Sequence, residues 1–352
     1  MINVAIIGAG IGIQHLTGYR ALPDRYSVRL LCDLDTSRAA AATKDDDDIQ
    51  VVSDIEDVLS NPDIDLVDVC LPPHLHAPVS IRVLEAGKNV ICEKPLGRSL
   101  AEVAQMQDAV ERTGGQIFPV FQYRFGLAFA QLKALRDAGL AGKALVASAE
   151  THWNREKEYY DVAWRGTWAG ESGGALLGHA IHSHDILCNV FGPVAQVAAF
   201  TDTRVNDIEV EDCATVSLRM ENGALASSSV TLGAAPDTSR LKFCFEGLTA
   251  ESGSNPYAPA DGTWTFTARG TTQQADIDRV LSQVEAPHGW FTGFLDAIAD
   301  ALGGNGGNEV TFEDGRRSIE LVTAIYSSAW EGRIVQLPIG KEDALYGGWS
   351  PA

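Results

Sequence analysis

The sequence is short of positive charge and of long apolar runs. Its 352 residues carry 27 Lys and Arg against 47 Asp and Glu, a formal net charge of −20. A chain this acidic repels phosphate backbones and anionic bilayers, so we expect neither a nucleic-acid nor a membrane partner. No apolar stretch approaches the length that crosses a bilayer.

Paired cysteines are also missing. The six cysteines stand singly among apolar neighbours, without a Cys-x-x-Cys motif, which is typical of buried thiols in a reducing compartment. The chain opens directly on a strand pattern, with no basic segment followed by a cleavable apolar one, so we expect a cytoplasmic protein. Its length predicts two domains.

The first distinctive pattern is a glycine-rich turn after an apolar run. Residues 3–7 are typical of a strand buried on both faces, and Gly8, Gly10 and Gly12 follow before a helical segment. Glycines let the backbone turn tightly and approach a pyrophosphate, which the helix N-terminus favours. The spacing is imperfect, because Ile13 stands where the usual fingerprint has its third glycine.

Strands and helices then alternate, which predicts a parallel, doubly wound sheet. The second strand, residues 28–32, ends in Asp33. An acid at that point accepts the ribose hydroxyls of NAD and repels the 2′-phosphate of NADP, so we expect NAD rather than NADP. The third strand, residues 66–71, ends in Leu71 and is closed by Pro72-Pro73, and His76 follows on an expected loop at the same sheet edge.

The sharpest corner of this half is Glu93-Lys94-Pro95, which ends the apolar strand 89–92. Proline forbids a normal ladder hydrogen bond and keeps the residue before it out of a helix. Lys94 is therefore expected at the carboxyl edge of the sheet, where ligands bind in open α/β folds. A surface lysine on a turn is the plainer alternative.

These motifs together carry a family resemblance. Gly8-Ala9-Gly10, Pro72-Pro73-x-x-His76 and above all Glu93-Lys94-Pro95 resemble the glucose–fructose oxidoreductase / inositol dehydrogenase (Gfo/Idh/MocA) family. The resemblance implies an NAD(P)-dependent enzyme whose lysine touches both the substrate hydroxyl and the nicotinamide, with a proline that often has a cis peptide bond. The expected cofactor contacts are Gly8, Gly10, Ile11, Gly12, Ile13, Asp33, Leu71, Pro72, His76, Glu93 and Lys94.

The two expected domains are residues 1–121, which bind NAD, and residues 122–352, which bind substrate. Residues 118–125 resemble the family's crossover strand, and Tyr123 and Arg124 would pass near the active site. For Arg124 we favour an interdomain salt bridge over a substrate contact. Alternating strands from residue 144 to 268, with a hairpin at Asn222-Gly223, predict a large, mainly antiparallel open-faced sheet. A sheet of this kind must cover its outer face, so we expect a homodimer or homotetramer.

Chemistry in this half concentrates in a helix expected after Gly173-Gly174 and ending before Gly192. Helical spacing puts His184 on an apolar stripe, as a hydrogen-bonded core histidine, and His182 with Asp185 on another stripe. The segment resembles the family pattern Gly-Gly-x-x-x-Asp-x-Gly-x-His-x-x-Asp, in which the first acid and the histidine assist proton transfer. Gly178 replaces that acid, so either His179 takes its role or Lys94 and His182 suffice.

Two further features near this helix have alternatives. The histidines at 179, 182 and 184 could suggest a metal site. Three such positions do not share one helix face, so we expect no metal there. The preceding aromatic loop contains Trp164 and Arg165, whose ring and charge suit a sugar, or it is simply a packed loop.

The sequence thus predicts an α/β oxidoreductase that moves hydride between NAD and a hydroxyl-bearing carbon of a sugar, polyol or sugar acid. Lys94 would stabilise charge on the oxygen and His182 would be the general base. The expected substrate contacts are Lys94, Tyr123, Arg124, Trp164, Arg165, His179, His182 and Asp185. The alternatives are an NAD-dependent glycoside hydrolase acting by transient oxidation and elimination, and a non-catalytic NAD-binding sensor.

Overall fold

The computed structural model describes residues 1–349, which form two compact units. The first holds Met1–Phe121 and Phe291–Arg316, and the second holds Gln122–Trp290 and the chain from Arg317 onward. A boundary between units thus coincides with the expected division after residue 121. The segment 291–316, expected with the second half, belongs instead to the first unit.

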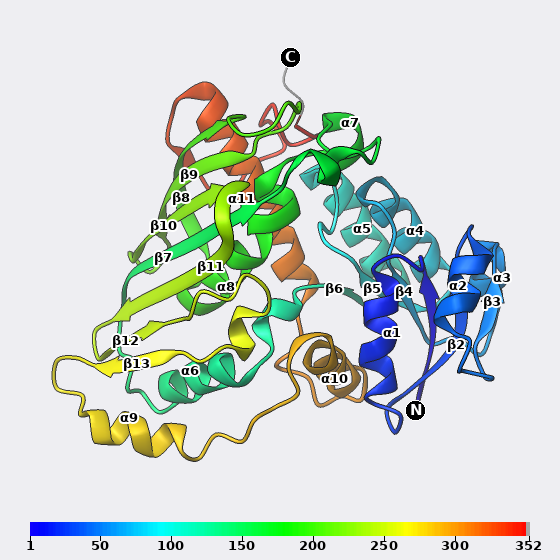
Figure 1. The fold of residues 1–352 in the computed structure, drawn as a ribbon, viewed down its shortest axis with the longest axis horizontal. Coiled ribbons are helices and arrows are strands. Elements are labelled where there is room, and N and C mark those ends of the chain that lie inside the picture. Colours follow the sequence, from blue (N-terminus) through cyan, green and yellow to red (C-terminus); the bar gives the residue numbers. More distant parts are fainter. Residues whose placement is uncertain (350–352) are drawn as a thin grey trace. The chain divides into compact units, whose positions relative to one another are not determined.

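The first unit is built on a parallel sheet of six strands in the order β3-β2-β1-β4-β5-β6 (Figure 1). The order reverses between β1 and β4, the point where ligands bind in such sheets. The strands are β1 (Ile2–Ile7), β2 (Tyr26–Cys32), β3 (Gln50–Val52), β4 (Leu66–Val69), β5 (Asn89–Cys92) and β6 (Ile117–Pro119).

Helices connect these strands and complete the unit. They are α1 (Gly12–Arg20), α2 (Thr36–Ala42), α3 (Ile55–Leu59), α4 (Pro73–Glu85), α5 (Leu100–Thr113) and most of α10 (Trp290–Leu302). The apolar runs of the sequence became the central strands, and Val4, Ala5 and Ile6 of β1 have no exposed surface.

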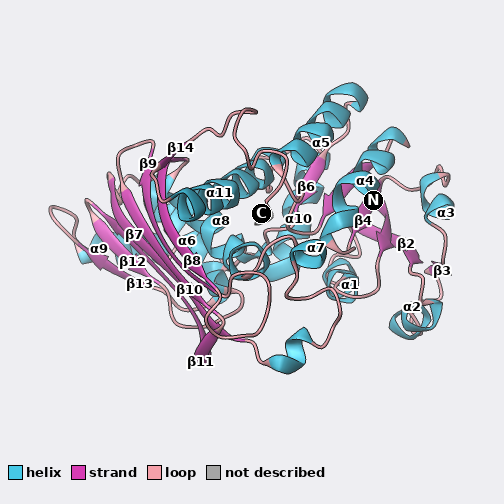
Figure 2. Cartoon of the chain, turned by 90° about the horizontal axis from the view of Figure 1, so that it is seen from above, coloured by secondary structure: helices cyan, strands magenta, loops and turns pink. Residues whose placement is uncertain are grey.

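The second unit contains an eight-stranded sheet in the order β13-β12-β11-β7-β10-β9-β8-β14, seen along its edge in Figure 2. Among the described strands of this second sheet, only β7 and β10 pair in parallel. The strands are β7 (Ala144–Asn154), β8 (Val194–Asp202), β9 (Cys213–Met220), β10 (Leu225–Thr231), β11 (Gly233–Phe245), β12 (Leu248–Glu251), β13 (Thr265–Ala268) and β14 (Val335–Gln336). The predicted fold class is confirmed.

Helices lie mainly on one face of this sheet (Figure 2). Ser328 of the long helix α11 accepts a hydrogen bond from the Ala199 amide of β8, and α8 packs on β7. The α-helices are α6 (Leu127–Asp137), α7 (Trp168–Glu171), α8 (Ile181–Phe191), α9 (Gln274–Leu281) and α11 (Phe312–Glu331), with short helices η1 (Gln122–Arg124), η2 (Lys157–Tyr160), η3 (Leu176–Ala180) and η4 (Pro259–Asp261).

Two local expectations were wrong, and a third was right about the helix but missed its opening turn. His76 lies in a helix and not in a loop, because α4 begins at Pro73, a residue well suited to the first helical turn. The expected strand 118–125 ends at Pro119 and gives way to η1, which carries Tyr123 and Arg124. The helix expected after Gly174 opens as a π-helix, η3, before it becomes α8. Nowhere in residues 1–349 is a helix long and apolar enough to cross a membrane.

Candidate active site

The glycine-rich turn joins β1 to α1 at the point where the strand order reverses. Gly8 has φ +105°, and a Cβ there would lie 2.2 Å from the Cys70 carbonyl oxygen, so a side chain is excluded. A Cβ on Gly12 would lie 2.8 Å from Cγ2 of Ile6, whereas one on Gly10 would meet no atom within 4 Å. Gly8 and Gly12 thus allow the close packing of β1, α1 and β4, and Gly10 leaves open space at the turn.

Asp33 reaches back from the end of β2 to this turn. Its carboxylate accepts hydrogen bonds from the amides of Ala9 (2.6 Å) and Asp35 (2.7 Å) and from the Arg38 guanidinium (2.9 Å). Burial alone would raise the pKa of Asp33, but these donors hold it below its usual range. Asp33 is therefore an ionised acid fixed beside the turn.

The turn suits a dinucleotide. Helix α1 begins at this turn without a side-chain cap, and a helix N-terminus at such a turn favours an anion. The open space at Gly10 lets a pyrophosphate approach the backbone, and Asp33 stands at the strand end where ribose binds. Ile11 is partly exposed beside the turn, at 38%.

The turn after β5 is held at both ends. The Glu93 carboxylate accepts a hydrogen bond from the Lys94 amide (2.9 Å), and the Pro95 carbonyl lies 2.6 Å from Nδ1 of His76. The other ring nitrogen of His76 lies 2.7 Å from the carbonyl oxygen of Leu71, next to Pro72. The Lys94–Pro95 peptide is cis, as the resemblance implies.

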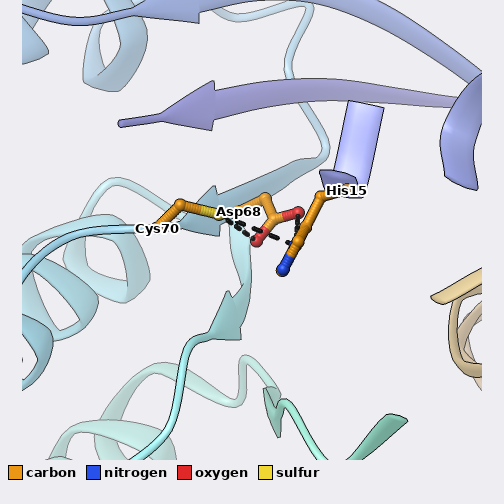
Figure 3. Close-up of side chains that lie close together, drawn as sticks. All are labelled: His15, Asp68 and Cys70. Atoms are coloured by element: carbon orange, nitrogen blue, oxygen red, sulfur yellow. Dashed lines mark hydrogen bonds and ion pairs between the residues drawn. The ribbon is translucent and has the colours of Figure 1, made fainter. Parts of the chain in front are cut away.

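A buried polar cluster that the sequence did not predict lies beside this turn; Figure 3 shows three of its side chains. His15 of α1 lies 2.8 Å from Oδ2 of Asp68 through Nδ1 and 3.1 Å from Oε1 of Glu93 through Nε2. Tyr19 and Cys70 also donate to Asp68, at 3.0 and 3.3 Å. One signal was visible: Asp68 is an acid inside the apolar strand β4, and buried acids need partners.

Three members of this cluster could ligate a metal by proximity. Ligand atoms of His15, Asp68 and Cys70 lie within 4.8 Å of one another. Each of these side chains is already hydrogen-bonded within the cluster, and burial keeps the pKa of Cys70 well above its usual range. The set therefore behaves as a hydrogen-bonded network, because a thiol and an imidazolium must lose protons before they bind metal.

In the second unit, a buried acid shapes the turn before His182. The Glu211 carboxylate accepts hydrogen bonds from the amides of Gly174 (3.1 Å) and Leu176 (2.9 Å) and from the Tyr326 hydroxyl (2.9 Å). A Cβ on Gly174 would lie 1.9 Å from the Glu211 carbonyl oxygen, so only glycine fits. These hydrogen bonds from Glu211 lie at the start of the π-helix η3.

His182 lies in the first turn of α8 and is 4% exposed. Its ring stacks on that of Tyr123, with centroids 4.2 Å apart and planes 10° from parallel. His184 points into the core, where its Nε2 lies 2.9 Å from Oγ of Ser228 and burial lowers its pKa to about 4. The predicted core role of His184 is confirmed.

Arg124 and Asp185 lie against each other in the same unit. Two guanidinium nitrogens of Arg124 lie 2.7 and 2.5 Å from the two carboxylate oxygens, and both side chains are buried. A bidentate pair of this kind fixes η1 against α8, and with them Tyr123 against His182. Both residues belong to the second unit, so this pair is not the interdomain salt bridge that we expected for Arg124. An interdomain role for Arg124, and a substrate contact by either residue, stay predictions.

The remaining predicted substrate residues gather around Tyr159. The Arg165 guanidinium lies 3.8 Å from the centre of that ring and 5.3 Å from that of Trp164. His179 approaches the same tyrosine and Trp153, with ring centroids 5.8 and 5.2 Å apart. The second unit therefore brings His179 and Arg165 to one aromatic cluster and His182 and Asp185 to the Tyr123–Arg124 segment. Lys94 belongs to the first unit, and its meeting with His182 is a proposal considered below.

Comparison with known proteins agrees with the resemblance. Residues 2–121 match the model of the oxidoreductase family with an NAD-binding Rossmann fold, and residues 129–250 match the GFO/IDH/MocA C-terminal domain. Levoglucosan dehydrogenase from Pseudarthrobacter phenanthrenivorans is 28% identical over 279 residues, which cover 70% of this chain and 71% of that protein. D-apiose dehydrogenase from Paraburkholderia graminis is 29% identical, covering 95% of this chain and 89% of that protein.

A solved structure extends the likeness to three dimensions. The WlbA dehydrogenase from Bordetella pertussis, in complex with NADH and UDP-GlcNAcA, superposes with a TM-score of 0.82. It is 27% identical, and the match covers 96% of this chain and 99% of that one. The glycine turn with Asp33, the lysine turn after β5 and both family models agree, and the chain belongs to the GFO/IDH/MocA family of NAD-binding oxidoreductases.

Proposed function

We propose that this protein oxidises a hydroxyl-bearing carbon of a sugar, polyol or sugar acid, with NAD as the hydride acceptor, or catalyses the reverse reaction. The observation that carries the proposal is the clamped turn at Lys94. Glu93 and His76 hold its main chain at the carboxyl end of β5, at the sheet edge that also carries the glycine turn. The relatives named for levoglucosan and D-apiose act on sugars, which supports this substrate class.

Each catalytic step has a residue suited to it. When bound, NAD supplies the hydride-accepting ring. The Lys94 ammonium hydrogen-bonds the substrate oxygen and offsets the negative charge that develops there. The imidazole of His182 takes the hydroxyl proton on a ring nitrogen, while stacking on Tyr123 fixes the plane of its ring.

The proposed mechanism needs no acid at position 178, where the family pattern has one. Gly178 offers no side chain, and His179 beside it is 7% exposed and lies near Tyr159 and Trp153. His179 therefore serves as a substrate contact in the aromatic cluster with Trp164 and Arg165, and proton transfer rests on Lys94 and His182. Asp33 selects NAD, since a 2′-phosphate would meet its ionised carboxylate.

The outer face of the eight-stranded sheet supports a homo-oligomer, dimer or tetramer. Its strands alternate between buried and exposed residues, and large apolar side chains are among the exposed ones. They include Val146 at 50%, Phe200 at 79% and Leu225 at 45%. A second copy of the chain would cover such a surface.

The test is a panel of sugars, inositols and sugar acids offered with NAD and NADP in parallel, read by the absorbance of reduced cofactor. With the best substrate, Lys94→Ala and His182→Ala should each lower kcat by at least about a hundredfold, the scale of general acid–base groups. Lys133→Ala, at an exposed surface ion pair, is the matched control. Near wild-type turnover in both variants, or free reducing sugar without reduced cofactor, would contradict the proposal.

A further inference from the structure

One buried titratable group, His15, has no part in the mechanism proposed above. His15 lies wholly inside the first unit between two acids, Asp68 at the end of β4 and Glu93 after β5. Its ring also lies against Phe291 of α10, with centroids 4.3 Å apart. Other titratable groups near this ring or the two acids include Tyr19, Tyr26, Cys70, His76, Cys92 and Lys94.

The geometry dictates where the protons lie. An ionised carboxylate only accepts hydrogen bonds, so a ring between two ionised carboxylates carries a proton on both nitrogens. Burial alone would lower the pKa of His15, but the charge of Asp68 and the hydrogen bonds outweigh it and raise that pKa well above 6.5. Burial likewise would raise the pKa of Glu93, yet hydrogen bonding to His15 lowers it. The cluster is thus an imidazolium between two carboxylates.

The second oxygen of Glu93 connects this cluster to the active site. Oε1 lies 3.1 Å from His15, and Oε2 accepts the Lys94 amide hydrogen bond at 2.9 Å. The Glu93 side chain therefore folds back toward its own main chain. Its Oε1 is bonded to His15 of α1, and its Oε2 is bonded to the amide of Lys94. Helix α1 is also the helix that begins at the glycine turn.

From this arrangement we infer that His15, as a cation, is a positioning residue for Lys94. It locks the Glu93 carboxylate in the conformation that holds the Lys94 main chain, and it ties that turn to the nucleotide-binding helix. The inference rests on the proposed role of Lys94. It also explains why a costly buried charge stands in the apolar strand β4: Asp68 supplies the counter-charge that keeps His15 protonated.

Hydrogen exchange at one amide tests the inference without any substrate. In uniformly ¹⁵N-labelled protein, in which both the Lys94 and the Glu93 amides can be followed, His15→Gln should speed exchange of the Lys94 amide, because Glu93 is then released to move. The Glu93 amide, which donates to the Val69 carbonyl in the sheet, should stay protected and serves as the internal control. Equal acceleration at both amides would mean general loosening and would overturn the inference.

The protonation state of His15 is tested in the unmodified protein, so it does not depend on a variant that folds. In ¹⁵N-histidine-labelled protein, both ring nitrogens of His15 should carry protons from pH 6 to pH 8. A neutral ring at pH 7 would overturn the inference. A shift of these nitrogens on adding Zn²⁺, with one metal retained after dialysis, would show a metal site instead and would also overturn it.

Kinetics separate positioning from plain stability. With the substrate found in the panel, His15→Gln should lower kcat by roughly tenfold to a hundredfold, the cost of a misplacement approaching 1 Å, and leave the dissociation constant for NADH unchanged. Tyr19→Phe is the matched control, because it removes another hydrogen bond to Asp68 without touching Glu93. Parallel losses of kcat in the two variants would assign His15 a merely structural role.

A double variant completes the design. If His15 acts through Glu93, the losses of His15→Gln and Glu93→Gln should not add in the combined variant; additive losses would refute the coupling. Should no compound in the panel be oxidised, the proposed function fails by itself. The amide-exchange and imidazole measurements would still decide whether His15 holds Glu93 against Lys94.

Discussion

Each unit of the molecule buries a glutamate, and the two are held in opposite ways. Glu93 in the first unit is 6% exposed and faces an imidazolium, while Glu211 in the second is 5% exposed and is held by two main-chain amides and a tyrosine hydroxyl. The pKa of Glu93 lies below its ordinary value, and that of Glu211 is raised to about 7. Burial is common to both, so the charge of the partner decides the direction.

The comparison separates two uses of a buried acid. A carboxylate paired with a cation stays ionised at all physiological pH values, and it can fix two elements in one arrangement. A buried carboxylate held only by neutral donors has a raised pKa, because burial disfavours its charged form and no cation compensates. The ionised Glu93 is suited to fix the turn that carries Lys94. Glu211 fixes the conformation of the turn at Gly174, which does not require a charged group.

The largest effect is expected where a charge-paired acid loses its cation. Asp185 resembles Glu93 in this respect, with Arg124 as its partner. Arg124→Met should lower the free energy of unfolding by about 3–5 kcal/mol, because it leaves a buried carboxylate without its counter-charge. Urea unfolding followed by fluorescence measures it. Arg38→Met, at a guanidinium that is 50% exposed, is the control and should cost less than about 1 kcal/mol; equal losses would break the comparison.

An intermediate effect is a difference in pH dependence between Glu93→Gln and Glu211→Gln. The raised pKa of Glu211 means that wild type loses stability as pH rises from 4.5 toward 7, so Glu211→Gln should gain on wild type across that range. The lowered pKa of Glu93 contributes stability above pH 4.5, which is lost as pH falls below it, so Glu93→Gln should be worse than wild type above 4.5.

Calorimetric melting temperatures from pH 4 to pH 8 measure both curves. Since the two variants carry the same chemical change at similarly buried sites, each is the control for the other. Parallel curves would show that burial, and not the partner's charge, controls both acids.

The smallest effect is expected from removing one neutral donor. Tyr326→Phe deletes the hydroxyl that donates to Glu211 and should cost about 1 kcal/mol, the usual contribution of a hydrogen bond. It should also raise the pKa of Glu211 further, extending the pH range over which stability falls. Thermal melts at pH 5 and pH 8 measure both effects, and a loss confined to pH 5 would contradict this account.

The sequence predicts the parts of the fold that depend on local pattern. The apolar runs became the parallel strands, Asn222-Gly223 forms the hairpin between β9 and β10, and Asp33 lies at the end of β2. The core position of His184 followed from helical spacing. Each of these depends on residues close together in the chain.

The features that the sequence did not reveal depend on distant partners. His15 meets Asp68 and Glu93 from 53 and 78 residues away, and Glu211 meets Gly174 from 37. Periodicity contains no information on such pairings, although a lone acid in an apolar strand indicates that one exists. The short helix η1 was missed for a similar reason, since Arg124 turns toward Asp185, 61 residues further along the chain.

The glycines before α8 differ in what they permit. Gly174 is pressed against the Glu211 main chain and admits no replacement, whereas a Cβ at Gly178 would meet no atom within 4 Å. Position 178 is also one turn before the proposed base, His182. Residue 178 is therefore the position to vary in a search for new substrates, because the helix should tolerate a side chain there and can gain stability when glycine is replaced. Residue 174 should remain glycine.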